Sequence, residues 1–387
     1  MKTWTALLVS VLLASCATTA PTPAPPAPRV EHLFSDALFG PPSERVSADD
    51  VFSVSDDMRH YLGGEIAALL RTRTPQRALI DALYDNGRLK LEYDAEVTRN
   101  ASQTFAAHAG NCLSLAIMTA AFAKEMGLPV RYQRILVDDA WSRSGDLYFS
   151  SGHVNLTLGG SRYGRILDYA DAETTIDFLP PGYTRGKRLR VIGEEMIVAM
   201  FMNNRAAESL ARGHLDEAYW WARGAIESDP KFLGSFNTLG IVYRHHGNLH
   251  NAEATLRHVL EVEPGNSPAM SNLALVLNDQ GRKTEAEALL AKLRELQPYP
   301  PFYFFNEGVA AMQQGDYKKA RDLFAKELDR DAFYHEFHFW IAAAYIGLGD
   351  VGEARGHLAI AMENSPTRKE HALYAAKLDR LSSYRPR

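Results

Sequence analysis

The two halves of the chain differ in how apolar and polar residues alternate along them. Between residues 46 and 192, short runs with a helical period are mixed with runs in which every second residue is apolar. From residue 199 to residue 366 only the helical period recurs. Helices bring every third or fourth residue to one face, and strands every second residue. We therefore expect an α+β domain followed by an all-helical domain.

The second half repeats itself every 34 residues. Five glycines keep this spacing, and an alanine follows each of them five residues later: Gly213, Gly247, Gly281, Gly315 and Gly349, then Ala218, Ala252, Ala286, Ala320 and Ala354. Prolines recur at the same interval as Pro230, Pro264, Pro298 and Pro366, with Ala332 in the remaining position. Each unit is predicted to be two helices, with glycine in the turn, alanine where the helices pack closely, and proline after the second helix.

These positions resemble the tetratricopeptide repeat, and Leu239-Gly240 with Tyr243 matches its first-helix pattern. The resemblance predicts five repeats over residues 199–366 and a capping helix and tail over residues 367–387. It also implies a protein or peptide partner on the concave surface, although a rigid spacer without a ligand is the alternative. The first unit is weaker, with Met202 and Arg205 at expected packing positions, and should lie against the preceding domain.

The first half contains a cysteine at the predicted start of a helix. Asn111 is a helix-capping residue type, and an apolar helical stripe follows Cys112 until Gly127 and Pro129 end it. Residues 75–86, which begin with Pro75, are predicted to form another helix. The amides and dipole of a helix N-terminus favour a thiolate over a thiol. Cys112 is therefore a candidate nucleophile.

A strand pattern follows, after a predicted strand over residues 129–138 and an irregular loop. In residues 152–158, apolar side chains alternate with polar ones that include His153. If Gly160-Ser161 forms a two-residue hairpin turn, His153 faces Asp168 on the next strand, residues 163–169. A facing carboxylate can hold the imidazole tautomer. The sequence thus predicts a nucleophile, a base and an orienting carboxylate.

The stretch Gly110-Asn111-Cys112-Leu113-Ser114, followed by Gly152-His153 and Leu167-Asp168, resembles the transglutaminase-like superfamily. The resemblance implies a papain/transglutaminase-like α+β fold over residues 44–198, with Cys112, His153 and Asp168 as catalytic residues. It implies acyl chemistry through a thioester. Hydrolysis is the preferred outcome, and peptidase, amidase and acyltransferase activities remain open. The chain departs from the family after His153, where Val154-Asn155 replaces a frequent aromatic.

Several alternatives to this site remain. His108, four residues before Cys112, is a second candidate base, and Gln103 or Gln133 could be an oxyanion donor beside the Cys112 amide. A zinc site of cysteine, histidine and aspartate lacks any local ligand spacing, so no metal and no cofactor are expected. The alternative of another class is a non-catalytic scaffold lipoprotein whose repeats assemble an envelope complex and whose triad is vestigial.

The N-terminus has the pattern of an export signal. Lys2 precedes an apolar run over residues 4–14, which is too short to span a membrane. Leu13-Ala14-Ser15-Cys16 resembles the lipobox of bacterial lipoproteins, and an ordinary secretory signal is the alternative. The resemblance implies a signal peptide over residues 1–15, lipidation of Cys16 and a Pro-rich tether over residues 16–43. Ala17 after this cysteine implies the periplasmic face of the outer membrane, with the lipid as the membrane contact.

Composition excludes one class of partner. The net charge is -5 and the isoelectric point is near 6.2, whereas nucleic-acid binding favours a strongly basic surface. No nucleic-acid partner is expected.

The sequence contains only two cysteines. If Cys16 is lipidated, Cys112 has no intrachain disulfide partner.

Overall fold

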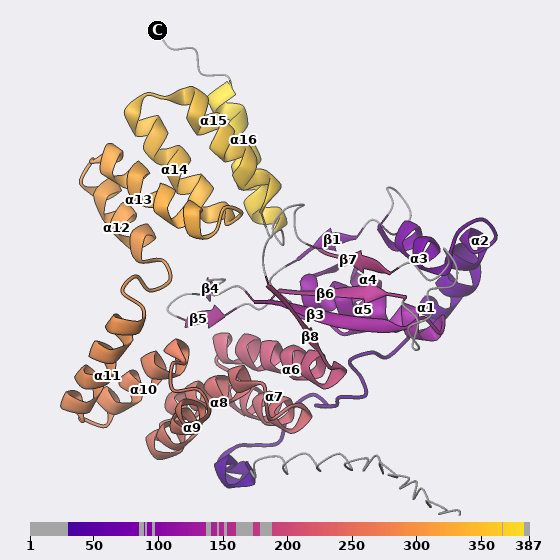
Figure 1. Ribbon diagram of the computed structural model, residues 1–387, viewed down its shortest axis with the longest axis horizontal. Helices are drawn as coiled ribbons and strands as arrows, with labels where there is room; N and C mark the ends of the chain where they lie inside the picture. The colour runs from indigo at the N-terminus through magenta and orange to yellow at the C-terminus, as the bar shows by residue number, and fades with distance from the viewer. Residues whose placement is uncertain are drawn as a thin grey trace, which may run out of the picture.

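The computed structural model describes residues 30–84, 89, 91–94, 97–136, 141–144, 147–150, 153–159, 173–178, 188–365 and 367–382. An α+β domain is followed by an array of helices, as the change of period predicts (Figure 1). The elements before the array are η1 (Glu31–Leu33), η2 (Asp36–Leu38), α1 (Asp56–Tyr61), η3 (Leu62–Ile66), α2 (Ala67–Leu69), α3 (Pro75–Tyr84), β1 (Glu92–Tyr93), α4 (Ala101–Ala107), β2 (Ala109–Gly110), α5 (Cys112–Glu125), β3 (Val130–Leu136), β4 (Trp141–Ser144), β5 (Leu147–Ser150), β6 (His153–Leu158), β7 (Thr174–Ile176) and β8 (Arg188–Ile192).

Four of these strands form one sheet in the order β7-β6-β3-β8, with antiparallel neighbours. β4 lies in the stretch expected to be an irregular loop, around residues 139–145, and pairs with β5, while β1 pairs with β2 in parallel. The predicted pairing of β6 with residues 163–169 is wrong at Leu156–Leu158. A strand has two edges, and at these positions β3 occupies one edge while β7 occupies the other, with Leu156 opposite Ile176.

Helix α5 is the centre of the first domain. All eleven residues from Leu113 to Ala123 are buried. An α-helix that is apolar on all sides must be covered on all sides, and β6, α3, α4 and α6 (Glu194–Ala211) pack around it. Because its whole circumference is packed, the direction in which its N-terminus points is fixed.

The array comprises five helix pairs and a final helix, as predicted. The first helix of the array begins at residue 194, five residues before the expected boundary. The helices after α6 are α7 (Leu215–Ser228), α8 (Leu233–His245), α9 (Leu249–Val262), α10 (Ser267–Asp279), α11 (Lys283–Leu296), α12 (Tyr303–Gln313), α13 (Tyr317–Arg330), α14 (His335–Leu348), α15 (Val351–Glu363) and α16 (Arg368–Ser382).

The repeated glycines and alanines have the predicted roles. Each of the five glycines lies between the two helices of a pair with a φ of 76° to 86°, a left-handed conformation that side chains disfavour. Each of the five alanines is completely buried. The spacing of 34 residues therefore reflects both a backbone constraint and a packing constraint.

The array is interrupted between α11 and α12. One buried core runs from Val30 to Ala286, and a separate cluster begins at Phe302. The cause lies in Pro300-Pro301, because a residue before proline is disfavoured in the helical conformation. Here α12 begins two residues late relative to the repeat, after Phe302 at φ 61°. The array thus consists of two blocks, α6–α11 and α12–α16.

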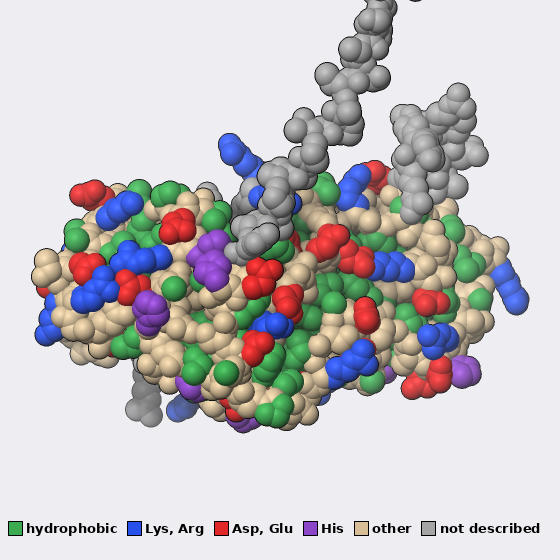
Figure 2. All heavy atoms as spheres, turned by 90° about the horizontal axis from the view of Figure 1, so that it is seen from below, with side chains coloured by type: hydrophobic (Ala, Val, Ile, Leu, Met, Phe, Trp, Pro, Cys, Tyr) green, Lys and Arg blue, Asp and Glu red, His purple; other side chains and the backbone are tan. Residues whose placement is uncertain are grey.

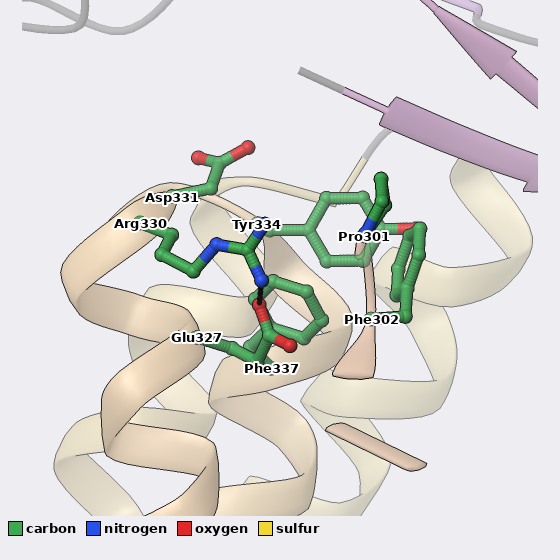
Figure 3. A pocket seen from close by; sticks show the side chains of 7 residues that line it. All are labelled: Pro301, Phe302, Glu327, Arg330, Asp331, Tyr334 and Phe337. Atoms are coloured by element: carbon green, nitrogen blue, oxygen red, sulfur yellow. Dashed lines mark hydrogen bonds and ion pairs between the residues drawn. The ribbon is translucent and has the colours of Figure 1, made fainter. Parts of the chain in front are cut away.

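Side chains of α13, in the second block, bind the backbone of this irregular linker and of the start of α12. Figure 3 shows Glu327 and Arg330 joined by an ion pair beside Pro301 and Phe302. Arg330 Nη1 donates to the Pro300 carbonyl at 3.2 Å, and Glu327 Oε1 accepts the Phe305 N–H at 3.2 Å. Glu327 therefore caps the start of α12, where Phe302 offers no capping side chain.

Residues 30–44, which we call the strap, differ from the prediction. The tether was expected to continue to residue 43, but this segment lies against α7 and α9 (Figure 1). Val30, Leu33 and Phe39 are buried, and the Phe39 ring stacks on Tyr219 with centroids 4.0 Å apart. The Pro-rich composition ends at residue 30, and these three apolar side chains are what the tether interpretation overlooked.

Polar contacts fix the strap in register. Tyr219 donates its hydroxyl to Asp36 at 2.5 Å and accepts the Ser35 N–H at 2.9 Å. Tyr243 donates to the Leu33 carbonyl at 2.8 Å, and Trp220 Nε1 donates to the Gly40 carbonyl at 2.6 Å. The strap thus satisfies its own backbone groups with side chains of the first two repeats.

The far end of the array returns to the first domain. The start of α16 lies near β1 in Figure 1, and Arg368 forms an ion pair with Glu92. On the face shown in Figure 2, basic and acidic side chains are interspersed. Among the helices of the described residues, none combines the length and apolar character needed to cross a bilayer.

The strap generates a stability prediction. Phe39→Ala should lower the free energy of unfolding by about 3 kcal/mol, because a buried, stacked ring is lost. Leu38→Ala is the matched control, since this neighbour is 41% exposed and should change stability by less than about 0.5 kcal/mol. Urea denaturation of both variants measures the difference. Equal, negligible effects would mean that the strap is a free tether after all.

Candidate active site

Cys112 is the first residue of α5, as predicted. Asn111 caps the helix by accepting the Ser114 N–H on its Oδ1 atom at 2.9 Å. Gly110 precedes this cap where space is short, because a Cβ atom there would lie 2.7 Å from Cβ of Ser114. The helix therefore starts at Cys112 for local reasons, and Cys112 as a whole residue is half-buried.

His153 is the first residue of β6 and is only 5% exposed. Its Nε2 atom lies 2.7 Å from Asp177 Oδ1, and its side chain hydrogen-bonds Cys112. Since Nε2 faces the carboxylate, Nδ1 is the ring nitrogen left for the sulfur. The structure thus brings together the predicted nucleophile and the predicted base, although they are 41 residues apart in the chain.

The carboxylate that contacts His153 is Asp177, which the sequence interpretation missed. Asp177 follows β7 directly, so continuing the observed register places it opposite Asn155 and diagonal to His153. Asn155 Nδ2 donates to the second oxygen of Asp177 at 3.3 Å. The predicted Asp168 lies outside the described residues. A short run of β-forming residues, Thr174-Thr175-Ile176, was the signal that could have revealed the acid after it.

The electrostatics of the pair favour charge separation. Burial opposes ionisation of Cys112, but the hydrogen bond and charge of His153, with backbone hydrogen bonds from Val154 and Leu113, outweigh it, so the thiol pKa is lowered. Burial also opposes protonation of His153, yet hydrogen bonds to Asp177 and Cys112 raise its pKa to about 9. Both shifts favour a thiolate beside an imidazolium over the neutral thiol and imidazole.

The rival residues have other surroundings. His108 is exposed, ends α4 at φ 51° and packs edge-on to Phe105. Gln103 accepts the Asn100 N–H in a capping box, and Gln133 Nε2 donates to Thr157 at 3.3 Å. Within the described residues, no group of three His, Cys, Asp or Glu side chains is placed to bind a metal ion.

The comparisons with known proteins concern the helical half. Residues 243–301 and 305–368 match models of the tetratricopeptide repeat. The array is a tetratricopeptide repeat solenoid. Its repeats suggest protein–protein interaction. Helices α6 and α7 precede the matched residues but share the same glycine and alanine positions. The predicted repeat class is thereby confirmed.

Several solved structures are similar to part of the chain. The MamA protein is 19% identical over 45% of this chain and 93% of its own, with a TM-score of 0.25. A thermophilic TPR protein of Thermus thermophilus is 18% identical over 46% and 98%, with a TM-score of 0.28. YrrB, a TPR protein with an unusual peptide-binding site, is 21% identical over 46% and 92%, with a TM-score of 0.25. No curated protein matches the chain.

The geometry predicts the titration of Cys112. In a chain carrying Cys16→Ser, Cys112 is the sole thiol, and its alkylation by iodoacetamide should titrate below the ordinary pKa of about 8.5. His153→Ala should raise this pKa, because burial is then opposed only by the backbone hydrogen bonds from Val154 and Leu113. The measurement is the second-order alkylation rate between pH 5 and pH 10. Wild-type and His153→Ala chains with the same ordinary titration would contradict the ion pair.

Three further variants test the neighbours assigned to this pair. Asp177→Asn should lower the rate at pH 6, because His153 loses the charge that stabilises its protonated form, whereas Asp168→Asn should not. The reverse result would return the orienting role to Asp168. His108→Asn should leave the profile unchanged, since Asn tolerates the left-handed conformation that His108 adopts.

Proposed function

We propose that the first domain is a papain/transglutaminase-like cysteine enzyme that transfers or hydrolyses acyl groups. The observation that carries the proposal is the hydrogen-bonded series Cys112, His153 and Asp177, with the cysteine at a helix N-terminus. A sulfur in this setting is nucleophilic near neutral pH. The order and residue types resemble the transglutaminase-like superfamily, with Asp177 in the acid position in place of Asp168.

The chemistry follows from the protonation states. The thiolate of Cys112 attacks an amide or ester carbonyl carbon, and a carbon–sulfur bond forms while the bond to the leaving group breaks. His153 gives its proton to the leaving amine or alcohol, and Asp177 stabilises the imidazolium. The developing oxyanion lies near the first-turn amides of α5, which have no intrahelical acceptor. Water then opens the thioester with His153 as base, or an amine takes the acyl group.

The acyl-enzyme is the direct test. Incubation of the Cys16→Ser chain with p-nitrophenyl acetate should add one acetyl group to Cys112, detected by mass spectrometry of the protein and its peptides. Hydroxylamine should remove it, because a thioester is cleaved by this amine. Cys112→Ala should remain unmodified, and His153→Ala should acylate at least tenfold more slowly at pH 7. A wild-type chain that acylates no faster than His153→Ala would favour a scaffold with a vestigial triad.

The repeats support a role in delivering substrate. A tetratricopeptide solenoid presents an extended surface to a peptide or protein. In this protein the first block of the solenoid, α6–α11, shares one buried core with the domain that carries Cys112. We infer that the repeats recruit an envelope protein or peptide on their concave surface.

We further propose that Cys16 is lipidated and holds the protein in the cell envelope, on the periplasmic face of the outer membrane. The proposal rests on the short apolar run and on Leu13-Ala14-Ser15-Cys16. Cells given radiolabelled palmitate should label the wild-type chain and not a Cys16→Ser chain. A wild-type chain that takes up no label would leave an ordinary secretory signal.

A further inference from the structure

A single buried threonine joins the first repeat helix to the residue that caps the catalytic helix. Thr98 is only 2% exposed. Its Oγ1 atom accepts the Asn111 side-chain amide at 2.9 Å and the Asn204 side-chain amide at 3.3 Å. Its backbone N–H donates to Glu208 Oε1 at 2.7 Å. Asn204 and Glu208 both belong to α6.

The hydroxyl group of Thr98 uses both its donor and its acceptor capacity. The hydroxyl of Thr98 also donates to Glu208, so its one proton and its acceptor capacity are both used. Glu208 is partly buried, and this burial raises the pKa of its carboxyl group. The hydrogen bonds from Thr98 and the charges of Arg205 and Arg212 lower this pKa, but their effect is smaller. Burying a carboxylate is costly unless it is hydrogen-bonded and paired with a positive charge, and Glu208 has both kinds of partner.

The connection continues outward to the strap. Arg205 Nη1 lies 3.3 Å from Glu208, and its Nη2 lies 2.6 Å from Glu44 of the strap. Trp221 Nε1 donates to the same Glu44 oxygen at 2.9 Å. The strap, the first repeat helix and the cap of α5 thus belong to one network of polar contacts.

We propose that Thr98 and Glu208 are positioning residues for Cys112, so that the first repeat helix is a structural part of the active site. The inference rests on the proposed function. Asn111 is held at both ends of its amide, by the Ser114 N–H and by Thr98. Without the Thr98 hydroxyl the amide can rotate, Ser114 loses its cap, and the first turn of α5 frays. The sulfur then loses the backbone hydrogen bond from Leu113.

The test uses the alkylation profile of Cys112 in the whole Cys16→Ser chain, with iodoacetamide as the probe. Thr98→Val keeps the shape and the backbone N–H but removes the hydroxyl. It should lower the alkylation rate at pH 6 about three- to tenfold and leave the rate above pH 9 unchanged, which is a shift of about half to one pKa unit. Thr98→Ser should restore the wild-type profile.

Matched variants separate positioning from general destabilisation. Thr119→Val removes another fully buried hydroxyl from α5 itself, one that bonds Leu115 and Tyr84, and should leave the titration unchanged. Glu208→Ala should shift the profile in the same direction as Thr98→Val, and the double variant should shift it no further, because both act through Asn111.

The outcomes are distinguishable. An ordinary thiol pKa in the Cys16→Ser chain itself would overturn the proposed function. A lowered pKa that Thr98→Val and Glu208→Ala both leave in place would overturn only the positioning role, as would an equal shift in Thr119→Val. If Thr98→Val does not fold, Glu208→Ala compared with Thr119→Val decides the question.

Discussion

The start of α5 is held by neighbours from three parts of the chain, and the candidate site depends on that constraint. Packing on all sides prevents α5 from rotating or sliding. β6 packs on the same helix and brings His153 to its N-terminal end. Asn111 fixes the first turn from one side, and Gly110 allows the chain to enter where a larger residue would collide with Ser114. The position of the sulfur relative to His153 is thus set mainly by how the helix is packed.

The two blocks of the solenoid are joined to the first domain in different ways. Its first block, α6–α11, shares a continuous buried core with the α+β domain and with the strap, so these parts form one folding unit. Its second block has cores of its own and follows an irregular linker at Pro300-Pro301. The ion pair between Arg368 and Glu92 joins this block to the first domain, but Arg368 is 83% exposed and such pairs contribute little stability.

The sequence carried more information about the solenoid than about the sheet. Every repeat needs a glycine that can adopt a left-handed conformation and an alanine that can be buried. Each need fixes a residue type at a constant position of the repeat, so the helix pairs could be predicted closely. Cys112 and His153 could also be placed, because a capping residue and a strand alternation are local signals. Asp177 could not, since a two-residue turn suggested the nearest strand as the partner of β6, whereas pairing is decided by which edges the rest of the sheet leaves open.

The interruption of the array and the bound strap were unpredictable for a related reason. The repeat pattern passes through α11 and α12 without a break, and only the two adjacent prolines differ there. The strap contains too few apolar residues to form a periodic pattern that would predict a helix or a strand. Its hydrogen-bond partners, Tyr219 and Trp220, lie about 180 residues away in the chain. Long-range contacts of this kind have no periodic signature.

If Cys16 is lipidated, as proposed, the docked strap also limits how far the molecule can stand from the membrane surface. Only 14 peptide steps separate Cys16 from Val30, where the chain meets the first repeats, and a fully extended chain of that length reaches about 50 Å. An acyl chain on Cys16 would therefore hold α7 and α9 within that distance of the membrane surface.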